Sequence, residues 1–207
     1  MPKIVDKNEK MKRISDAALR VFRKLGYPRS RMVDIAAEAG IGKGTIYEYF
    51  NNKADILRFA FEQYFRIFSD GAIQTIMKEN RPVDKLLALV DFSLRHAADW
   101  EDHCAVYVDY FGAARTDEED RFSLVGMNEE MKRILRALIE EGQDAGEIDT
   151  EFNPMTGAEL LLSMFDGVIF HRIFVGWGSD IDSVRKAAIR LITRGLLLGQ
   201  SMDGSKG

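Results

Sequence analysis

Apolar residues recur every three to four positions along most of this 207-residue chain, and no run alternates between apolar and polar residues with a period of two. The first spacing puts apolar side chains on one face of a helix, whereas a half-buried strand needs the second. Only four prolines interrupt the pattern. We therefore predict an all-α fold. The roughly nine predicted helices span residues 7–24, 32–39, 43–50, 53–77, 83–98, 101–114, 118–144, 155–175 and 181–199.

Local signals at two of these boundaries support the helix assignment. Gly26 follows the first helix, and Pro28 prevents the helix from continuing. Asn52 and Asp55, three residues apart, predict an N-cap and a capping box at the start of the fourth helix.

Composition restricts the class of protein. The single cysteine, Cys104, excludes an internal disulfide and fits a reducing cytoplasm. No apolar secretory segment is found near the N-terminus. The most apolar stretch, residues 160–177, contains Asp166, His171 and Arg172, and charges at bilayer depth are costly. We expect a cytoplasmic protein without a membrane span, in which this stretch is a buried helix.

Charge is divided unevenly along the chain. Residues 1–58 contain 13 Lys and Arg against seven Asp and Glu, out of totals of 29 and 33, so this part carries +6. The remainder, with 16 basic and 26 acidic residues, carries −10. A basic N-terminal part on an acidic body indicates that one end binds a polyanion, although a basic stretch is also commonly a solvated surface.

Residues 32–50 have the pattern of a helix-turn-helix. Two helices that cross closely need a small residue at the crossing, which Ala36 supplies, and a residue that accepts positive φ in the turn, which Gly40 supplies. Four apolar residues are spaced to hold both helices on the first helix, although an ordinary helical corner would show the same pattern. They are Ile35, Ile41, Ile46 and Phe50.

The second helix of this motif is predicted to present a surface suited to DNA. With Ile46 and Phe50 facing inward, Lys43, Thr45, Tyr47 and Tyr49 remain outside. Lysine and tyrosine can contact phosphates, and threonine and tyrosine can contact base edges. Gly42 and Gly44 leave the N-terminus of the helix open to a phosphate, and Glu48 is expected to point to solvent.

These residues resemble the TetR family of transcriptional regulators. The resemblance covers residues 10–58 and rests on four matched segments followed by Asn52-Lys53: Ala-Ala-Leu-Arg-Val-Phe at 17–22, Gly-Tyr at 26–27, Asp-Ile-Ala-Ala-Glu-Ala-Gly at 34–40, and Gly-Lys-Gly-Thr-Ile-Tyr-Glu-Tyr-Phe at 42–50. It implies a DNA-binding domain over residues 8–68, with the helix-turn-helix at 31–50, and a ligand-binding and dimerisation domain over 69–200. The implied DNA contacts are Arg31, Gly42, Lys43, Gly44, Thr45, Tyr47, Tyr49 and Lys53.

Two positions depart from the family pattern. Arg31 stands where the family usually has a capping threonine, and Gly42 stands where it usually has serine. Because arginine accepts no hydrogen bond, either Ser30 caps the helix instead or Arg31 reaches the DNA backbone as a cation.

The predicted helix over 155–175 carries apolar residues almost all round, and the helix over 181–199 repeats this pattern except for a narrow polar strip of Lys186, Arg190 and Arg194. A helix without a solvent face is buried on both sides, so we predict a homodimer, with burial inside one protomer as the alternative. Two related DNA-binding heads favour a palindromic operator. The predicted interface residues are Leu161, Met164, Val168, Arg172, Ala188, Leu191 and Ile192.

The resemblance also implies a cavity in the body for a small effector. Aromatic side chains and flexible methionines are abundant there, although most such residues simply form a core. We predict a repressor that a small apolar or aromatic effector releases from its operator. The predicted ligand-binding residues are Tyr64, Phe65, Phe68, Trp100, Tyr107, Tyr110, Met127, Met131, Phe165 and Asp166.

The alternative function is a helical small-molecule-binding protein or an enzyme without DNA binding. We find no phosphate-binding glycine loop and no nucleophile motif, so an enzyme is not expected. The adjacent His103 and Cys104 point to different faces of a helix and make a metal site improbable. No metal or other cofactor is predicted.

Overall fold

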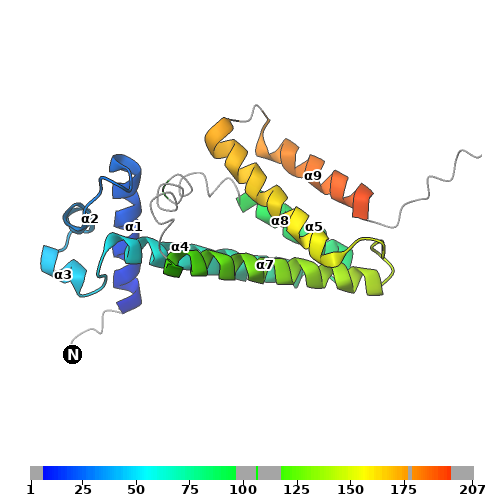
Figure 1. Ribbon diagram of the computed structural model, residues 1–207, viewed down its shortest axis with the longest axis horizontal. Helices are drawn as coiled ribbons and strands as arrows, with labels where there is room; N and C mark the ends of the chain where they lie inside the picture. Colours follow the sequence, from blue (N-terminus) through cyan, green and yellow to red (C-terminus); the bar gives the residue numbers. More distant parts are fainter. Residues whose placement is uncertain (1–6, 97–105, 107–117, 177–178, 197–207) are drawn as a thin grey trace, which may run out of the picture. The chain divides into compact units, whose positions relative to one another are not determined.

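A computed structural model describes residues 7–96, 106, 118–176 and 179–196, although it leaves out the side chains of 118–127, 173 and 174. Within these ranges every regular segment is helical, which confirms the all-α fold. The segments are α1 (Lys7–Leu25), α2 (Met32–Ala39), α3 (Lys43–Tyr47), α4 (Lys53–Ile76), α5 (Pro82–His96), α7 (Glu118–Asp144), α8 (Pro154–Phe170), a π-helical turn (His171–Val175) and α9 (Ile181–Leu196) (Figure 1).

The helices begin and end close to the predicted positions, with two informative differences. α3 stops at Tyr47 instead of Phe50, because the amides of Glu48 and Tyr49 bond to carbonyls only three residues back. α8 stops at Phe170, and the chain continues in the π-helical turn. The helix predicted over residues 101–114 lies outside the described residues except for Val106.

The described residues form two compact units. The first contains residues 7–68, Val106 and 118–123, and the second contains 69–96 and the rest of the chain. α4 is continuous from the first unit into the second. Among the helices within the described ranges, none combines the length and the apolar character that crossing a membrane requires.

The core of the first unit forms around α1. Its buried apolar face includes Ile14, Ala18 and Phe22, as the three-and-four spacing predicts. Ile35 of α2 and Ile46 of α3 are also fully buried in this unit. Burial of two such side chains contributes about 1.5–3 kcal/mol each, so apolar contact determines how α2 and α3 sit on α1.

The start of α4 has the predicted cap. The side-chain oxygen of Asn52 accepts the amide of Asp55 at 2.8 Å, and the Asp55 carboxylate accepts the amide of Asn51 at 3.2 Å. The reciprocal pair confirms the N-cap, although the carboxylate reaches one residue further back than a standard capping box.

α5 is the central helix of the second unit, and both α8 and α9 pack against it. Its N-terminus is capped from a distant part of the chain. The carboxylate of Glu147, in the loop after α7, accepts the amide of Val83 at 3.1 Å and pairs with Arg81 at 2.8 Å. These two bonds hold the pKa of Glu147 below its usual value, with the Arg81 bond the larger cause.

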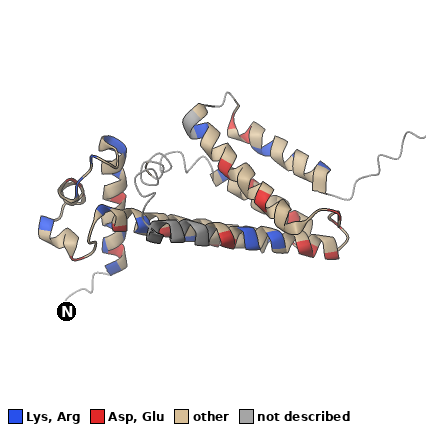
Figure 2. Cartoon of the chain, in the orientation of Figure 1, with Lys and Arg blue, Asp and Glu red and all other residues tan. Residues whose placement is uncertain are grey.

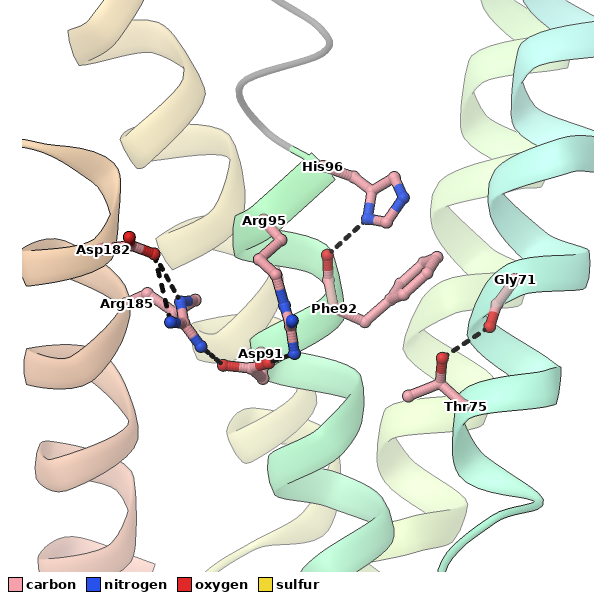
Figure 3. Close-up of polar contacts among 8 residues, drawn as sticks. All are labelled: Gly71, Thr75, Asp91, Phe92, Arg95, His96, Asp182 and Arg185. Atoms are coloured by element: carbon pink, nitrogen blue, oxygen red, sulfur yellow. Dashed lines mark hydrogen bonds and ion pairs between the residues drawn. The ribbon is translucent and has the colours of Figure 1, made fainter.

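Ion pairs join α5 to α9 in the same unit (Figure 3). Asp91 on α5 is largely buried and contacts Arg185 of α9, whose guanidinium also bonds to Asp182 at 3.1 Å. Arg95 pairs with Asp91 from the same helix and is much more exposed. On the other side of α5, a Cβ at Gly71 would lie only 2.7 Å from the ring of Phe92. A larger residue at position 71 of α4 would therefore force this ring to shift.

Replacing Arg185 by methionine should lower the melting temperature, because Asp91 would lose its partner from another helix while remaining largely buried. Arg95→Met is the matched control, since it removes an exposed pair within one helix and should change stability little. Thermal denaturation followed by circular dichroism measures both. Equal melting temperatures for the two variants would contradict an anchoring role for Arg185.

Candidate nucleic-acid interface

The turn between α2 and α3 depends on Gly40. Its φ is +67°, and its amide bonds to the carbonyl of Ala37 at 3.2 Å. The next amide, Ile41, bonds to Ala36 at 3.0 Å and completes the C-terminal cap of α2. Ala36 is buried as expected, so the turn has the predicted geometry.

α3 has one buried and one exposed side. Ile46 has no exposed surface, whereas Tyr47 is 47% exposed. Lys43 is also exposed, and Thr45 and Tyr49 are half-buried. Burial of Ile46 therefore turns a polar, tyrosine-bearing surface away from the core.

The charge on this surface is available to a ligand. Lys43, at the first position of α3, forms no ion pair or hydrogen bond with any residue that the structure describes. Glu48 is exposed, as expected. Figure 2 shows further Lys and Arg along α1. An exposed cation at a helix N-terminus is a position from which a phosphate can be bound.

Gly42 and Gly44 flank Lys43 and are both exposed. A Cβ at Gly44 would meet nothing within 4 Å, and one at Gly42 would meet only Thr45, at 3.7 Å. The protein's own packing thus gives no reason for glycine at position 44. Glycine there leaves room for an external surface to approach the backbone of α3.

Of the two expectations for the start of α2, the structure contradicts capping by Ser30, and the contact of Arg31 with the DNA backbone stays a prediction. Ser30 is buried and its hydroxyl donates to the carbonyl of Gly26 at 2.8 Å, so it does not cap α2. The carboxylate of Asp34 accepts the amide of Arg31 at 3.0 Å and the guanidinium at 3.2 Å. This pairing lowers the pKa of Asp34, with the guanidinium hydrogen bond the largest cause. Arg31 remains exposed, but its charge is neutralised by Asp34.

Tyr49 and Lys53 each face a second group within the first unit. The Lys10 ammonium lies 5.8 Å from the centroid of the Tyr49 ring, which joins α1 to the segment after α3. The Lys53 ammonium lies 4.4 Å from the centroid of Tyr27 and donates to the Tyr27 carbonyl at 2.7 Å. Partial burial lowers the pKa of Lys53.

The predicted ligand-binding residues are divided between the two units. Tyr64, Phe65 and Phe68 are half-buried on the part of α4 that belongs to the first unit, with the rings of Phe65 and Phe68 6.0 Å apart. Met131 and Phe165 are buried in the second unit. Trp100, Tyr107 and Tyr110, together with the side chain of Met127, lie outside the described residues.

Two polar groups of the second unit lack partners among the described residues. Asp166 is in α8, and desolvation by neighbouring atoms raises its pKa although the residue still reaches the surface. The hydroxyl of Ser93 in α5 is buried without a hydrogen bond. A buried hydroxyl of this kind needs a ligand or a water. Sequence reasoning missed Ser93, since a serine in an amphipathic helix carries no signal of its own.

The predicted interface residues fall into three groups. Leu161, Val168 and Ala188 are buried inside the protomer, where a partner would not reach them. Met164, Arg172 and Ile192 are half-buried, and Leu191 is 73% exposed.

Two family models match this chain. The model of the tetR family of bacterial regulatory proteins matches residues 14–59, and that of the tetracyclin repressor-like C-terminal domain matches residues 79–170. Together they cover the helix-turn-helix and most of the described part of the second unit.

The chain is similar to known regulators over nearly its whole length. It is 26% identical over 192 residues to the fatty acid metabolism regulator protein of Bacillus subtilis, covering 92% of this chain and 97% of the relative. The fold resembles a putative transcriptional regulator from Saccharomonospora viridis in complex with choline (TM-score 0.81, 21% identity, 92% and 99% of the two chains). It also resembles FadR from Bacillus subtilis in complex with stearoyl-CoA (TM-score 0.74, 23% identity, 89% and 98%).

Alanine at Gly40 and at Gly44 should have opposite effects on stability. Gly40→Ala forces an L-residue into positive φ and should cost about 1–2 kcal/mol of unfolding free energy. Gly44→Ala removes a helical glycine without a clash and should stabilise the fold by up to about 1 kcal/mol. Denaturant unfolding measures both. Destabilisation by Gly44→Ala would show that the protein itself requires this glycine.

Proposed function

The chain belongs to the TetR family of bacterial regulatory proteins and is a helix-turn-helix transcription regulator. From this premise we propose that it is a cytoplasmic, homodimeric repressor. In this proposal residues 8–68 bind a palindromic operator, and residues 69–200 dimerise and bind an effector that releases the DNA.

The observation that carries the proposal is the exposed surface of α3. Because Ile46 is buried, Lys43 and Tyr47 are both exposed on α3. Gly44 lies between them, and the packing of the described residues does not require glycine there. Lys43 is suited to a phosphate, and Tyr47 to a phosphate or a base edge. Gly42, Thr45, Tyr49 and Arg31 complete the proposed contact set, with Arg31 exchanging Asp34 for a phosphate when DNA binds.

The double variant Lys43→Ala, Tyr47→Ala should lose operator binding at physiological salt, because both side chains are exposed and both are proposed to contact DNA. Its melting temperature should stay close to that of the wild type, since neither side chain belongs to the core. A labelled duplex selected by the wild-type protein from a random-sequence pool, used in fluorescence anisotropy, measures binding. Unchanged affinity of the double variant would contradict this contact set.

We place the dimer interface on the exposed sides of α8 and α9. Leu160 and Phe170 of α8 are more than half exposed, and Gly167 lies on the same helical face between them. On α9, Leu191 and Gly195 are four residues apart and exposed. Large apolar side chains exposed on one surface favour burial against another copy. The neighbouring residues Leu161, Val168 and Ala188 support these helices from inside the protomer.

The two glycines strengthen this choice of partner. A Cβ at Gly167 or Gly195 would meet no atom of the described residues within 4 Å. Glycine inside a helix, as at Gly167, costs about 1 kcal/mol relative to alanine, and no contact with a described residue accounts for it. A second copy packed closely on these faces accounts for both residues.

Gly167→Leu should therefore convert the dimer into a monomer while leaving the protomer folded. The matched control is Ala137→Leu, which places the same side chain at an exposed position of α7. Sedimentation velocity at micromolar concentration gives the mass of each variant, and circular dichroism gives its melting temperature. A dimeric Gly167→Leu protein would show that the interface lies elsewhere.

For the effector we propose a long-chain acyl thioester. The support comes from the Bacillus subtilis relative, a fatty acid metabolism regulator, and from the similar FadR structure that contains stearoyl-CoA. Within the second unit, the buried side chains of Met131 and Phe165 are apolar and suit an acyl chain. The hydroxyl of Ser93 is available to a polar group of the ligand.

A quaternary ammonium compound is the second candidate, because a similar structure contains choline and the carboxylate of Asp166 has no partner among the described residues. A carboxylate and aromatic rings are the groups that recognise such cations.

Stearoyl-CoA should raise the melting temperature and release the selected duplex, whereas coenzyme A alone should do neither. A ligand at 100 times its Kd stabilises the protein by about 2.7 kcal/mol, which thermal denaturation resolves. Asp166→Asn should leave this response unchanged. If choline stabilises the wild type and Asp166→Asn abolishes its effect, the acyl thioester is the wrong effector. No response to either ligand would contradict both candidates.

A further inference from the structure

We infer that Lys53 is a positioning residue that fastens the turn between α1 and α2 to the start of α4, and that it does not contact a DNA phosphate. This inference rests on the proposed DNA-binding function and changes the role that family resemblance gives to Lys53. The two lysines then have different roles: Lys43 contacts DNA, and Lys53 holds the turn between α1 and α2, a role we call the clamp.

The hydrogen-bonding capacity of the Lys53 side chain is fully used inside the protein. A lysine ammonium has three N–H donors and no acceptor. The ammonium of Lys53 donates to the carbonyls of Tyr27 at 2.7 Å, Pro28 at 3.1 Å and Ser30 at 3.1 Å. All three donors are therefore used inside the protein. A phosphate could bind this ammonium only by displacing a carbonyl, which would then need another partner.

The acceptors of this clamp are themselves held in place. The ring of Tyr27 lies 4.4 Å from the ammonium and packs edge-on against the buried ring of Phe22 at 5.2 Å. The hydroxyl of Ser30 is bonded to Gly26. The ammonium therefore binds a preformed turn that is anchored in the core of α1.

The position of Lys53 on α4 points to the same role. Lys53 is the first residue of α4, where a positive charge opposes the helix dipole and is unfavourable. The side chain places its ammonium among three carbonyl oxygens, and these hydrogen bonds offset the unfavourable interaction with the helix dipole.

The helix-turn-helix is attached to α4 at two points, one after α3 and one before α2, and α3 carries the exposed surface of Lys43 and Tyr47 (the reading surface). After α3, the buried ring of Phe50 packs edge-on against Phe59 of α4 at 5.6 Å. Lys53 supplies a polar attachment of the same helix to the turn that leads into α2. α3 and α2 are thus both tied to the first two turns of α4, the helix that continues into the second unit. A displacement of α4 would carry the reading surface with it.

The test compares Lys53→Met with Lys43→Met. Operator affinity is measured by fluorescence anisotropy across a potassium chloride series, with the duplex selected by the wild-type protein. Each phosphate contact contributes about 0.9 to the slope of log K against log salt, so loss of one contact in each protomer lowers the slope of a dimer by about 1.8. We expect this loss in Lys43→Met. Lys53→Met should keep the wild-type slope and bind about tenfold more weakly at temperatures well below its melting temperature.

Two further measurements separate positioning from the alternatives. Lys53→Arg keeps donors and charge and should recover most of the affinity. Hydrogen exchange of the DNA-free protein should be faster at residues 26–31 in Lys53→Met than in the wild type or in Lys43→Met. A slope reduced by about 1.8 in Lys53→Met would make Lys53 a phosphate contact and overturn the inference. A Lys53→Met protein that is less stable but binds the operator with wild-type affinity would show that Lys53 only stabilises the fold. That result would also overturn the inference.

The same data distinguish this inference from the proposed function. A wild-type protein that selects no duplex contradicts DNA binding. Hydrogen exchange still tests the clamp in that case: unchanged exchange at residues 26–31 in Lys53→Met shows that the clamp does not hold the turn.

Discussion

The helix-turn-helix depends on the burial of one isoleucine from α2 and one from α3 in the core of the first unit. Ile35 and Ile46 have no exposed surface, and the apolar face of α1 is buried in the same unit. Because a helix places Tyr47 next to Ile46 but on another side, burying one exposes the other. The reading surface is therefore a consequence of core packing. The polar residues on this surface face outward because Ile46 is buried. Their identity is therefore not fixed by folding and can suit a ligand.

Glycines that the core does not require mark positions where we propose that a ligand or a second copy approaches. Gly44 is in a helix, has negative φ and would meet no neighbour if it carried a side chain, and the same holds for Gly167 and Gly195. Gly71 differs, because the ring of Phe92 fills the space of its missing Cβ. Gly71 therefore serves packing within one protomer, whereas Gly44, Gly167 and Gly195 are the glycines that we propose leave room for DNA or for another copy.

The second unit uses contacts between distant parts of the chain to hold its helices. Glu147 caps α5 from the loop after α7, and Arg185 joins α9 to α5 through Asp91. Gln143, near the end of α7, donates to the carbonyls of Asp149 and Phe152 and orders the loop that leads into α8. α8 and α9 are thus supported from one side by α5 and its loops, and their opposite sides remain exposed for the proposed dimer.

The sequence by itself determined the features that depend on neighbours within a few residues. The bounds of α2, the positive φ of Gly40 and the cap formed by Asn52 and Asp55 all follow from local spacing, because helices and caps involve residues three to five positions apart. Only the tertiary structure decided where Lys53 donates, since its acceptors lie 23 to 26 residues earlier in the chain. It also decided that Leu161 is buried and Leu160 exposed. A helix that is apolar almost all round has no periodicity to show which side faces its own core, so packing against α5 makes that choice.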